Sequence, residues 1–145
     1  MSADYPSMTT AEIRSKFLNF FEERGLKLYP SSSLVPDDPS LLLANAGMNQ
    51  FKEYYQGKKT MKEIGAISCQ KCVRTNDIDC IGEDGRHLSF FEMLGDFSFG
   101  GVSKEQACAW AFELITKEFK LPLDRLYFTV FTAVSYTHLT LPTIR

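Results

Sequence analysis

The sequence predicts an α+β fold in which an antiparallel sheet is flanked by helices. Two segments, which begin near Thr9 and Ser103, place apolar residues at helical spacing behind capping residues. Short apolar runs bounded by Gly, Pro and Ser lie between these segments and predict strands. The length of 145 residues, with 44% hydrophobic and 23% charged residues, is typical of one globular domain.

The first helix is expected to begin at Thr9, because Thr9 and Glu12 form a capping-box pattern. Gly25 is expected to end it. Its apolar face consists of Ile13, Phe17, Phe20 and Phe21. A face this rich in aromatic residues is expected to pack on the sheet.

Three short elements are predicted next. Residues 26–29 favour a short strand, and residues 41–44 (LLLA) favour a buried strand. Aromatic residues at 51, 54 and 55 indicate a short helix that ends at Gly57.

A long hairpin is predicted in the middle of the chain. Residues 66–73 and 87–99 are expected to be its strands, and the polar residues 74–86 an exposed loop. A second helix follows, with Ser103 and Gln106 as its capping box. Its apolar stripe consists of Ala107, Trp110, Ala111, Leu114 and Ile115. Residues 126–131 (LYFTVF) predict a further strand.

Composition excludes several classes of protein. The net charge of −2 gives no overall positive field to attract nucleic acid, so nucleic-acid binding would need a local site or a part of the protein outside this chain. No apolar run has the length of a membrane span, and the N-terminus lacks the pattern of a secretory signal. Four cysteines are too few for a disulfide scaffold in a chain of this length. We therefore expect a cytoplasmic protein.

Cysteines at 69, 72 and 80, together with His87, leave open a small zinc-binding or redox protein. Against a zinc site, Cys69 and Cys72 are three residues apart on a predicted strand, so their side chains would point to opposite faces. Ordinary buried or edge thiols are the alternative.

The ends of the predicted hairpin loop combine cations with an aromatic residue. Arg74 lies where the first strand meets the loop, Arg86 and His87 lie where the chain returns, and Phe91 follows on the second strand. A guanidinium binds phosphate and carboxylate through parallel donors, and an aromatic ring offers a purine a stacking surface. The pattern suits a nucleoside triphosphate lying along the hairpin, although a lone arginine at a strand end is more often a solvated surface charge.

Two motifs resemble those of the alanyl-tRNA synthetases, a class II family. They are NAGMNQFK at residues 45–52 and FFEMLG at residues 90–95. The resemblance runs from about Thr9 to Thr132 and includes QKCVR at residues 70–74. It implies a class II fold, in which an antiparallel sheet is flanked by helices. It also implies activation of alanine by ATP to alanyl-adenylate, followed by transfer of the alanyl group to tRNA(Ala).

The resemblance assigns roles to particular residues. Arg74 would be the catalytic arginine that bridges the α-phosphate of ATP and the substrate carboxylate. The polyphosphate would contact His87, with Arg86 beside it. Phe91 would stack on adenine, and Asp77 would help to hold the nucleotide.

Further expectations follow from the family. Asn45 and Met48 lie in a stretch similar to the turn that lines the alanine pocket. Mg²⁺ is expected on the ATP phosphates, whereas zinc is expected only in an editing domain outside this chain. Glu92 could be either a site acid or a strand-surface charge.

The resemblance also predicts the organisation of the chain. Residues 1–132 would be the N-terminal part of the catalytic domain, with the first two class II motifs. Residues 133–145 do not continue the family pattern, so we expect a non-native tail there. A synthetase-like paralogue that binds nucleotide without charging tRNA is the alternative function.

Overall fold

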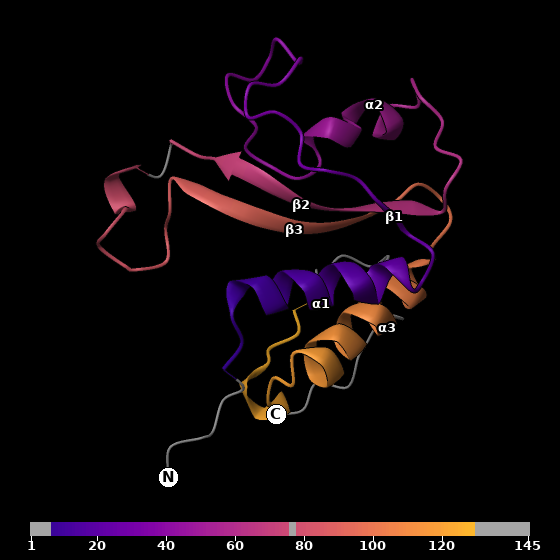
Figure 1. The fold of residues 1–145 in the computed structure, drawn as a ribbon, viewed down its shortest axis with the longest axis vertical. Coiled ribbons are helices and arrows are strands. Elements are labelled where there is room, and N and C mark those ends of the chain that lie inside the picture. Colours follow the sequence, from indigo (N-terminus) through magenta and orange to yellow (C-terminus); the bar gives the residue numbers. More distant parts are fainter. Residues whose placement is uncertain (1–6, 76–77, 130–145) are drawn as a thin grey trace. The chain divides into compact units, whose positions relative to one another are not determined.

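A computed structural model describes residues 7–75 and 78–129 (Figure 1). The expected tail at 133–145 and the last two residues of the predicted strand at 126–131 lie outside the described residues. The chain divides into two compact units, one of Arg14–Val102 and the other of Met1–Ile13 with Ser103–Arg145. The hairpin and its surroundings lie in the first unit.

The sheet has three strands in the order β1-β2-β3: β1 (Lys27–Leu28), β2 (Gly65–Val73) and β3 (Phe90–Ser98). β2 and β3 form the expected antiparallel hairpin, but β1 runs parallel to β2. The sheet is therefore mixed rather than antiparallel. The physical reason is the long connection between β1 and β2, which gives the chain room to cross over and return in the same direction.

Helix α1 (Thr10–Glu22) confirms the first predicted helix. The Glu12 N–H donates to Thr9 Oγ1 at 3.2 Å, and Glu12 Oε2 accepts from the Thr9 N–H at 2.7 Å, so both halves of the capping box form. Gly25 has a φ of +88°, a conformation open to glycine, just after the helix ends. The buried residues of α1 are Phe17, Phe20 and Phe21.

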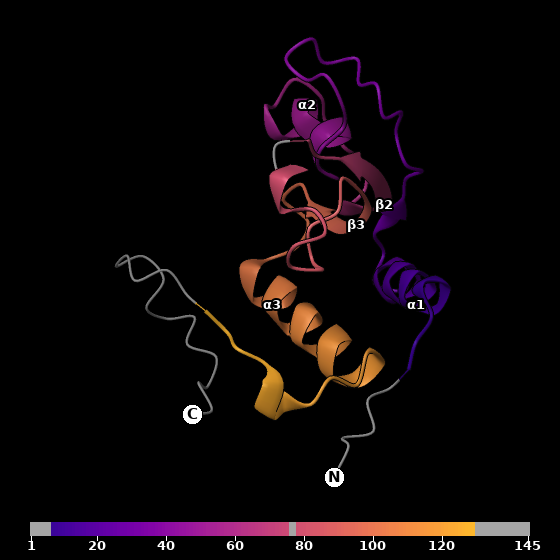
Figure 2. The same ribbon diagram turned by 90° about the vertical axis from the view of Figure 1, so that its left-hand side faces the viewer.

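The connection between β1 and β2 lies on one side of the sheet and α1 on the other (Figures 1 and 2). The connection contains a 3₁₀ turn (Asn49–Phe51) and helix α2 (Lys52–Tyr55), which confirm the short helix expected before Gly57. The buried strand expected at 41–44 is wrong. Leu42 is 92% exposed, and only Ala44 of this run is buried. Asp38, whose carboxylate accepts from the Ser40 N–H at 2.9 Å, starts a turn that prevents the run from extending.

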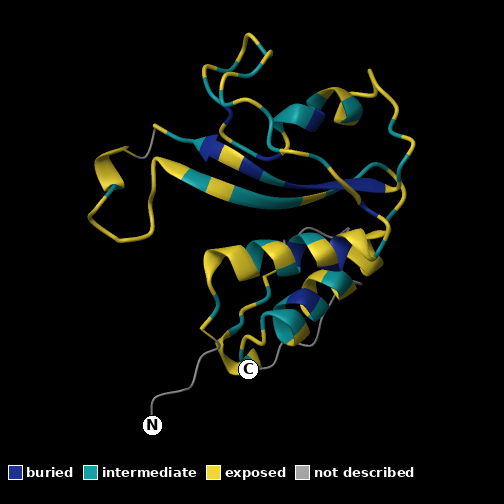
Figure 3. Cartoon of the chain, in the orientation of Figure 1, coloured by how far each residue is buried: buried dark blue, intermediate teal, exposed yellow. Residues whose placement is uncertain are grey.

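β2 is the central strand, and Gly65 to Ser68 are all buried (Figure 3). Phe51 from the connection and Ile67 from β2 are among the most deeply buried side chains. β3 begins at Phe90, three residues after the predicted start at His87, so His87 belongs to the loop.

In the other unit, α3 (Lys104–Glu113) begins with the expected capping box of Ser103 and Gln106. One turn of π-helix (Leu114–Glu118) follows it. The expected apolar stripe is only partly covered, since Leu114 is buried whereas Ala107 and Ala111 are exposed. Residues 126–129 form no strand, which contradicts the prediction for them. An apolar run becomes a strand only when a neighbouring strand pairs with it, and among the described residues these four have no such neighbour.

Candidate functional site

The hairpin brings Arg74 and Phe91 to one face of the sheet. Phe91 lies opposite Cys72, and the Arg74 N–H donates to the carbonyl oxygen of Ser89 at 2.9 Å, which continues the ladder past the end of β2. Side chains two residues apart on a strand share a face, so Arg74, Cys72 and Phe91 lie on the same side. The guanidinium carbon of Arg74 is 5.2 Å from the centroid of the Phe91 ring, within cation–π range.

The turn at residues 44–48 borders this pair. The Val73 N–H donates to the carbonyl oxygen of Ala44 at 2.9 Å, and Arg74 Nε donates to the carbonyl oxygen of Asn45 at 3.1 Å. The structure therefore brings Asn45, Arg74 and Phe91 together. Met48 lies in the same turn, and its side chain is 46% exposed.

Met93 and Gly47 lie next to Arg74 and Phe91. Met93 is two residues from Phe91 on β3 and shares its face. The Gly47 N–H points at Met93 Sδ, with a separation of 3.2 Å. The turn that carries Asn45 and Met48 is thus attached to the hairpin at both Gly47 and Asn45.

A buried glutamine holds the other end of this connection. Gln70 Oε1 accepts from the N–H and the hydroxyl of Ser32 at 2.8 and 3.1 Å, and from Gln50 Nε2 at 3.2 Å. Gln70 Nε2 donates to the carbonyl oxygens of Ser32 and Lys71 at 3.2 and 2.8 Å. The sequence reasoning did not single out Gln70, because a polar residue on a strand gives no sign that it is buried.

Arg86 and His87 lie apart from this group, in the exposed loop between β2 and β3. The structure shows them bound to Asp84. Asp84 Oδ1 accepts from both of their backbone N–H groups, and Asp84 Oδ2 lies 2.5 Å from His87 Nδ1. These bonds, led by those from the two backbone amides, lower the pKa of Asp84 to about 2. Asp77 lies outside the described residues.

Asp84 was also missed by the sequence reasoning. The signal was present, since an Asp followed by Gly directly before the predicted cations is typical of a tight turn. Its carboxylate contacts both Arg86 and His87.

Glu92 is an ion-pair partner on the other face of the sheet. Its carboxylate is 2.6 Å from Arg14 Nη2, and this bond lowers the pKa of Glu92. The face shared by Arg74 and Phe91 is the opposite one, because Glu92 directly follows Phe91 along β3. The structure thus favours a structural role for Glu92, which links α1 to the sheet, over a role as a site acid.

The zinc hypothesis is not supported by the geometry. Cys72 is buried on the face of Phe91, whereas Cys69 is on the face of Glu92. Burial raises the pKa of both thiols, which disfavours the thiolate that a metal would need. Within residues 7–75 and 78–129, no three His, Cys, Asp or Glu side chains are grouped so that they could hold a metal ion.

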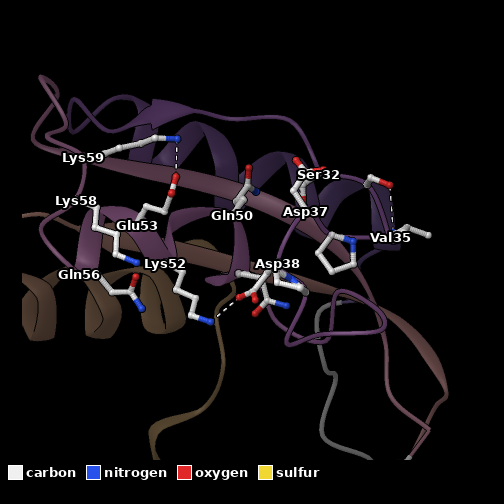
Figure 4. Close-up of a pocket in the computed structure, with 14 residues that line it drawn as sticks. Ser32, Val35, Asp37, Asp38, Gln50, Lys52, Glu53, Gln56, Lys58 and Lys59 are labelled. Atoms are coloured by element: carbon white, nitrogen blue, oxygen red, sulfur yellow. Dashed lines mark hydrogen bonds and ion pairs between the residues drawn. The ribbon is translucent and has the colours of Figure 1, made fainter.

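A separate cavity of about 490 Å³ lies between residues 32–39 and residues 49–59 (Figure 4). Two ion pairs lie along its lining: Asp38 with Lys52 at 2.5 Å, which joins the two segments, and Glu53 with Lys59 at 2.5 Å, which lies within residues 49–59. Lys52 and the Ser40 side chain hold the pKa of Asp38 well below its usual range. Neither Arg74 nor Phe91 lines this cavity, so it is distinct from the site that the hairpin forms.

Comparisons of the sequence with known proteins indicate a family for this chain. Residues 12–137 match the family model of tRNA synthetases class II (A). The chain is 56% identical over 119 residues to an alanine–tRNA ligase, chloroplastic/mitochondrial, of Sorghum bicolor, and this match covers 82% of the chain and 12% of the relative. It is 51% identical over 131 residues to an alanine–tRNA ligase of Synechocystis, a match that covers 90% of the chain and 15% of the relative.

A third relative, an alanine–tRNA ligase of Pseudothermotoga lettingae, is 52% identical over 124 residues, which is 86% of the chain and 14% of the relative. The chain thus spans only 12 to 15% of the length of these relatives. None of the helices in the described part of the chain has the length and apolar character needed to cross a membrane. Because the family model covers most of its length, the chain belongs to the class II (A) family of tRNA synthetases.

Proposed function

We propose that the full-length protein is an alanine–tRNA ligase and that this chain supplies part of its ATP site. The observation that carries the proposal is the placement of Arg74 and Phe91 on one face of the hairpin, 5.2 Å apart. The relatives named above are alanine–tRNA ligases, which supports alanine as the amino acid. The first reaction joins the alanine carboxylate to the α-phosphorus of ATP and releases pyrophosphate. The second transfers the alanyl group to a ribose hydroxyl of tRNA(Ala) and releases AMP.

Phe91 and Arg74 divide the binding of ATP between them. The Phe91 ring offers a flat apolar surface on which adenine stacks. The Arg74 guanidinium contacts the α-phosphate and the alanine carboxylate, and so stabilises the negative charge that develops as the carboxylate attacks phosphorus. The bond from Arg74 Nε to Asn45 fixes the orientation of the guanidinium before substrate binds.

The remaining residues complete the proposed site. Arg86 and His87 contact the polyphosphate from the loop, and Asp77 helps to hold the nucleotide. Asn45 and Met48 border the alanine pocket. Met93 next to them is attached to Gly47, which keeps this turn close to Arg74.

Mg²⁺ accompanies ATP in this proposal, bound to the phosphate oxygens, where its charge offsets theirs. Among the residues that the structure describes, no cluster of carboxylates or histidines forms a metal site.

The proposed location is the cytoplasm, and the partners are ATP, alanine and tRNA(Ala). The relative from Sorghum bicolor carries a chloroplastic/mitochondrial name, so organelles of a plant or alga are the competing location. Fractionation of the source cells, followed by detection with an antibody to this chain, separates the two.

The test is alanine-dependent ATP–pyrophosphate exchange by the full-length protein and its Arg74→Ala variant. We expect exchange by the variant to fall by about 10²- to 10³-fold, the usual effect of removing one donor that stabilises the transition state. The matched control is Arg125→Ala, which removes the same chemical group from an exposed position outside the unit that carries the hairpin and should retain most of the activity. Near-normal exchange by the Arg74 variant would refute the proposed role. Absence of alanine-dependent exchange in the unaltered protein would refute the function.

A further inference from the structure

A single carboxylate organises the end of the hairpin loop. Asp84 Oδ1 accepts from the N–H of Arg86 at 2.9 Å and from the N–H of His87 at 3.0 Å. Asp84 Oδ2 lies 2.5 Å from His87 Nδ1. Gly85 has a φ of +65°, which lets the chain turn back between Asp84 and the two residues that it contacts.

These bonds determine what His87 can offer to a ligand. With Nδ1 directed at Asp84, the other ring nitrogen, Nε2, is on the far side of the imidazole and points away from the carboxylate. The His87 side chain is 47% exposed, so neighbouring side chains cover only part of the ring. Asp84 is then the group that orients it.

We propose that Asp84 is a positioning residue for the nucleotide site: it fixes the backbone of Arg86 and His87 and directs Nε2 of His87 toward the polyphosphate of ATP. This inference rests on the proposed function. A ring that donates from Nδ1 to Asp84 and from Nε2 to a phosphate oxygen carries both protons, and its positive charge lies between two anions. Asp84 touches neither ATP nor alanine and acts only through Arg86 and His87.

The Asp84→Asn variant separates orientation from folding. Its amide oxygen can still accept from the two backbone N–H groups, so the turn is retained. Its NH₂ group would face His87 Nδ1 as a donor, which favours the tautomer with the proton on Nε2. Glu83→Gln is the matched control, because it removes the same charge one residue away and no side-chain bond from Glu83 to Arg86 or His87 is present in the described loop.

The first measurement is ¹⁵N NMR of the histidine rings in this chain. The chain has two histidines, His87 and His138, so a His138→Gln variant assigns both rings. When the ring is neutral, we expect the proton on Nδ1 in the unaltered chain and in Glu83→Gln, and a shift toward Nε2 in Asp84→Asn. The same tautomer in Asp84→Asn as in the unaltered chain would overturn the inference, whatever the function of the protein.

The second measurement is ATP–pyrophosphate exchange by the full-length protein. We expect Asp84→Asn to raise KM for ATP about tenfold and to leave KM for alanine unchanged, while Glu83→Gln changes neither. A general loss of structure would raise both KM values and would count against the inference. If Arg74→Ala abolishes exchange but Asp84→Asn has no effect, the inference fails and the proposed function stands. If the unaltered protein shows no alanine-dependent exchange, the proposed function fails, and this inference fails with it.

Discussion

Replacement of Gln70 by Leu is expected to destabilise the unit that carries the site. The Gln70 side chain is 1% exposed, and both backbone polar groups of Ser32 are bonded to it. Leucine has a similar size but can neither accept nor donate. The N–H and the carbonyl oxygen of Ser32 would then lose their partners in a place that water reaches poorly.

The expected loss of stability follows from the N–H and the carbonyl oxygen of Ser32. Each unpaired buried group costs about 1–2 kcal/mol, so the free energy of unfolding should fall by about 2–4 kcal/mol. Gln50, whose Nε2 also donates to Gln70, is only partly buried and can turn toward solvent, so it adds little. The matched control is Gln56→Leu, the same chemical change at an exposed position, where the expected change is within about 0.5 kcal/mol.

The assay is urea unfolding together with amide hydrogen exchange. Because the chain contains two compact units, a single unfolding transition is not assured, and exchange at the Ser32 and Lys71 amides reports on the relevant unit directly. We expect faster exchange at both amides in Gln70→Leu. If the free energy of unfolding and both exchange rates stay at the values of the unaltered chain, the hydrogen bonds of Gln70 do not hold the connection to the sheet.

Three other predictions concern stability. In Gly95→Ala, the added Cβ would lie 2.6 Å from Cζ of Phe97, so the ring must move. We expect urea unfolding to show a decrease of about 1–3 kcal/mol in the free energy of unfolding. A decrease below about 0.5 kcal/mol would contradict this prediction. Ser103→Ala removes the acceptor of the Gln106 N–H at the start of α3 and should lower the stability of the helix by about 1 kcal/mol. Amide exchange at the start of α3 should therefore be faster in Ser103→Ala, whereas Ser103→Thr should keep the cap. Equal exchange rates in the two variants would contradict this role of Ser103. The hydrogen bonds of the ionised Asp84 carboxylate lower its pKa to about 2 and so stabilise the folded state. This contribution is complete above the ordinary aspartate pKa of about 3.9 and is lost as the pH falls through about 2. Carbon NMR of the carboxyl group during acid titration checks this, and a midpoint near 4 would refute it.

The helix starts and ends that the sequence predicts correctly have local causes. The start of α1 depends on Thr9 and Glu12, and the start of α3 on Ser103 and Gln106, each pair only three residues apart. Gly25 and Gly57, with φ of +88° and +69°, follow α1 and α2 by the same local rule. Such signals act within one turn of chain, so they can be recognised without knowledge of the fold.

The errors arise where a distant partner decides the structure. LLLA at 41–44 has the composition of a strand, but the turn begun by Asp38 and the exposure of Leu42 show that no strand pairs with it. In the described residues 126–129, Tyr127 is 91% exposed, again without a strand beside it. The parallel direction of β1 depends on the path of the long connection to β2, which short-range patterns do not report.

The candidate site depends on the register of the hairpin, which the sequence alone did not determine. Phe91 pairs with Cys72, and Arg74 follows Cys72 by two residues, so both side chains share a face. A slip of one residue would pair Phe91 with Lys71 or Val73 and move its ring to the face of Glu92, away from Arg74. The loop between the strands is too long to prevent such a slip.

Packing on both faces holds the register instead. On one face, the Phe97 ring lies within 3.2 Å of the place that a Cβ on Gly47 would occupy and crosses Gly95, so a larger residue opposite Ser68 would not fit. On the other face, Glu92 is ion-paired with Arg14 of α1. A slip would bury the Glu92 carboxylate under the connection and remove the Phe97 ring from its contact with Phe51, where the ring centroids are 4.8 Å apart. Both changes would cost free energy, the first through desolvation of a charge and the second through lost packing. The residues that place Arg74 beside Phe91 are therefore largely ones that would never contact a nucleotide.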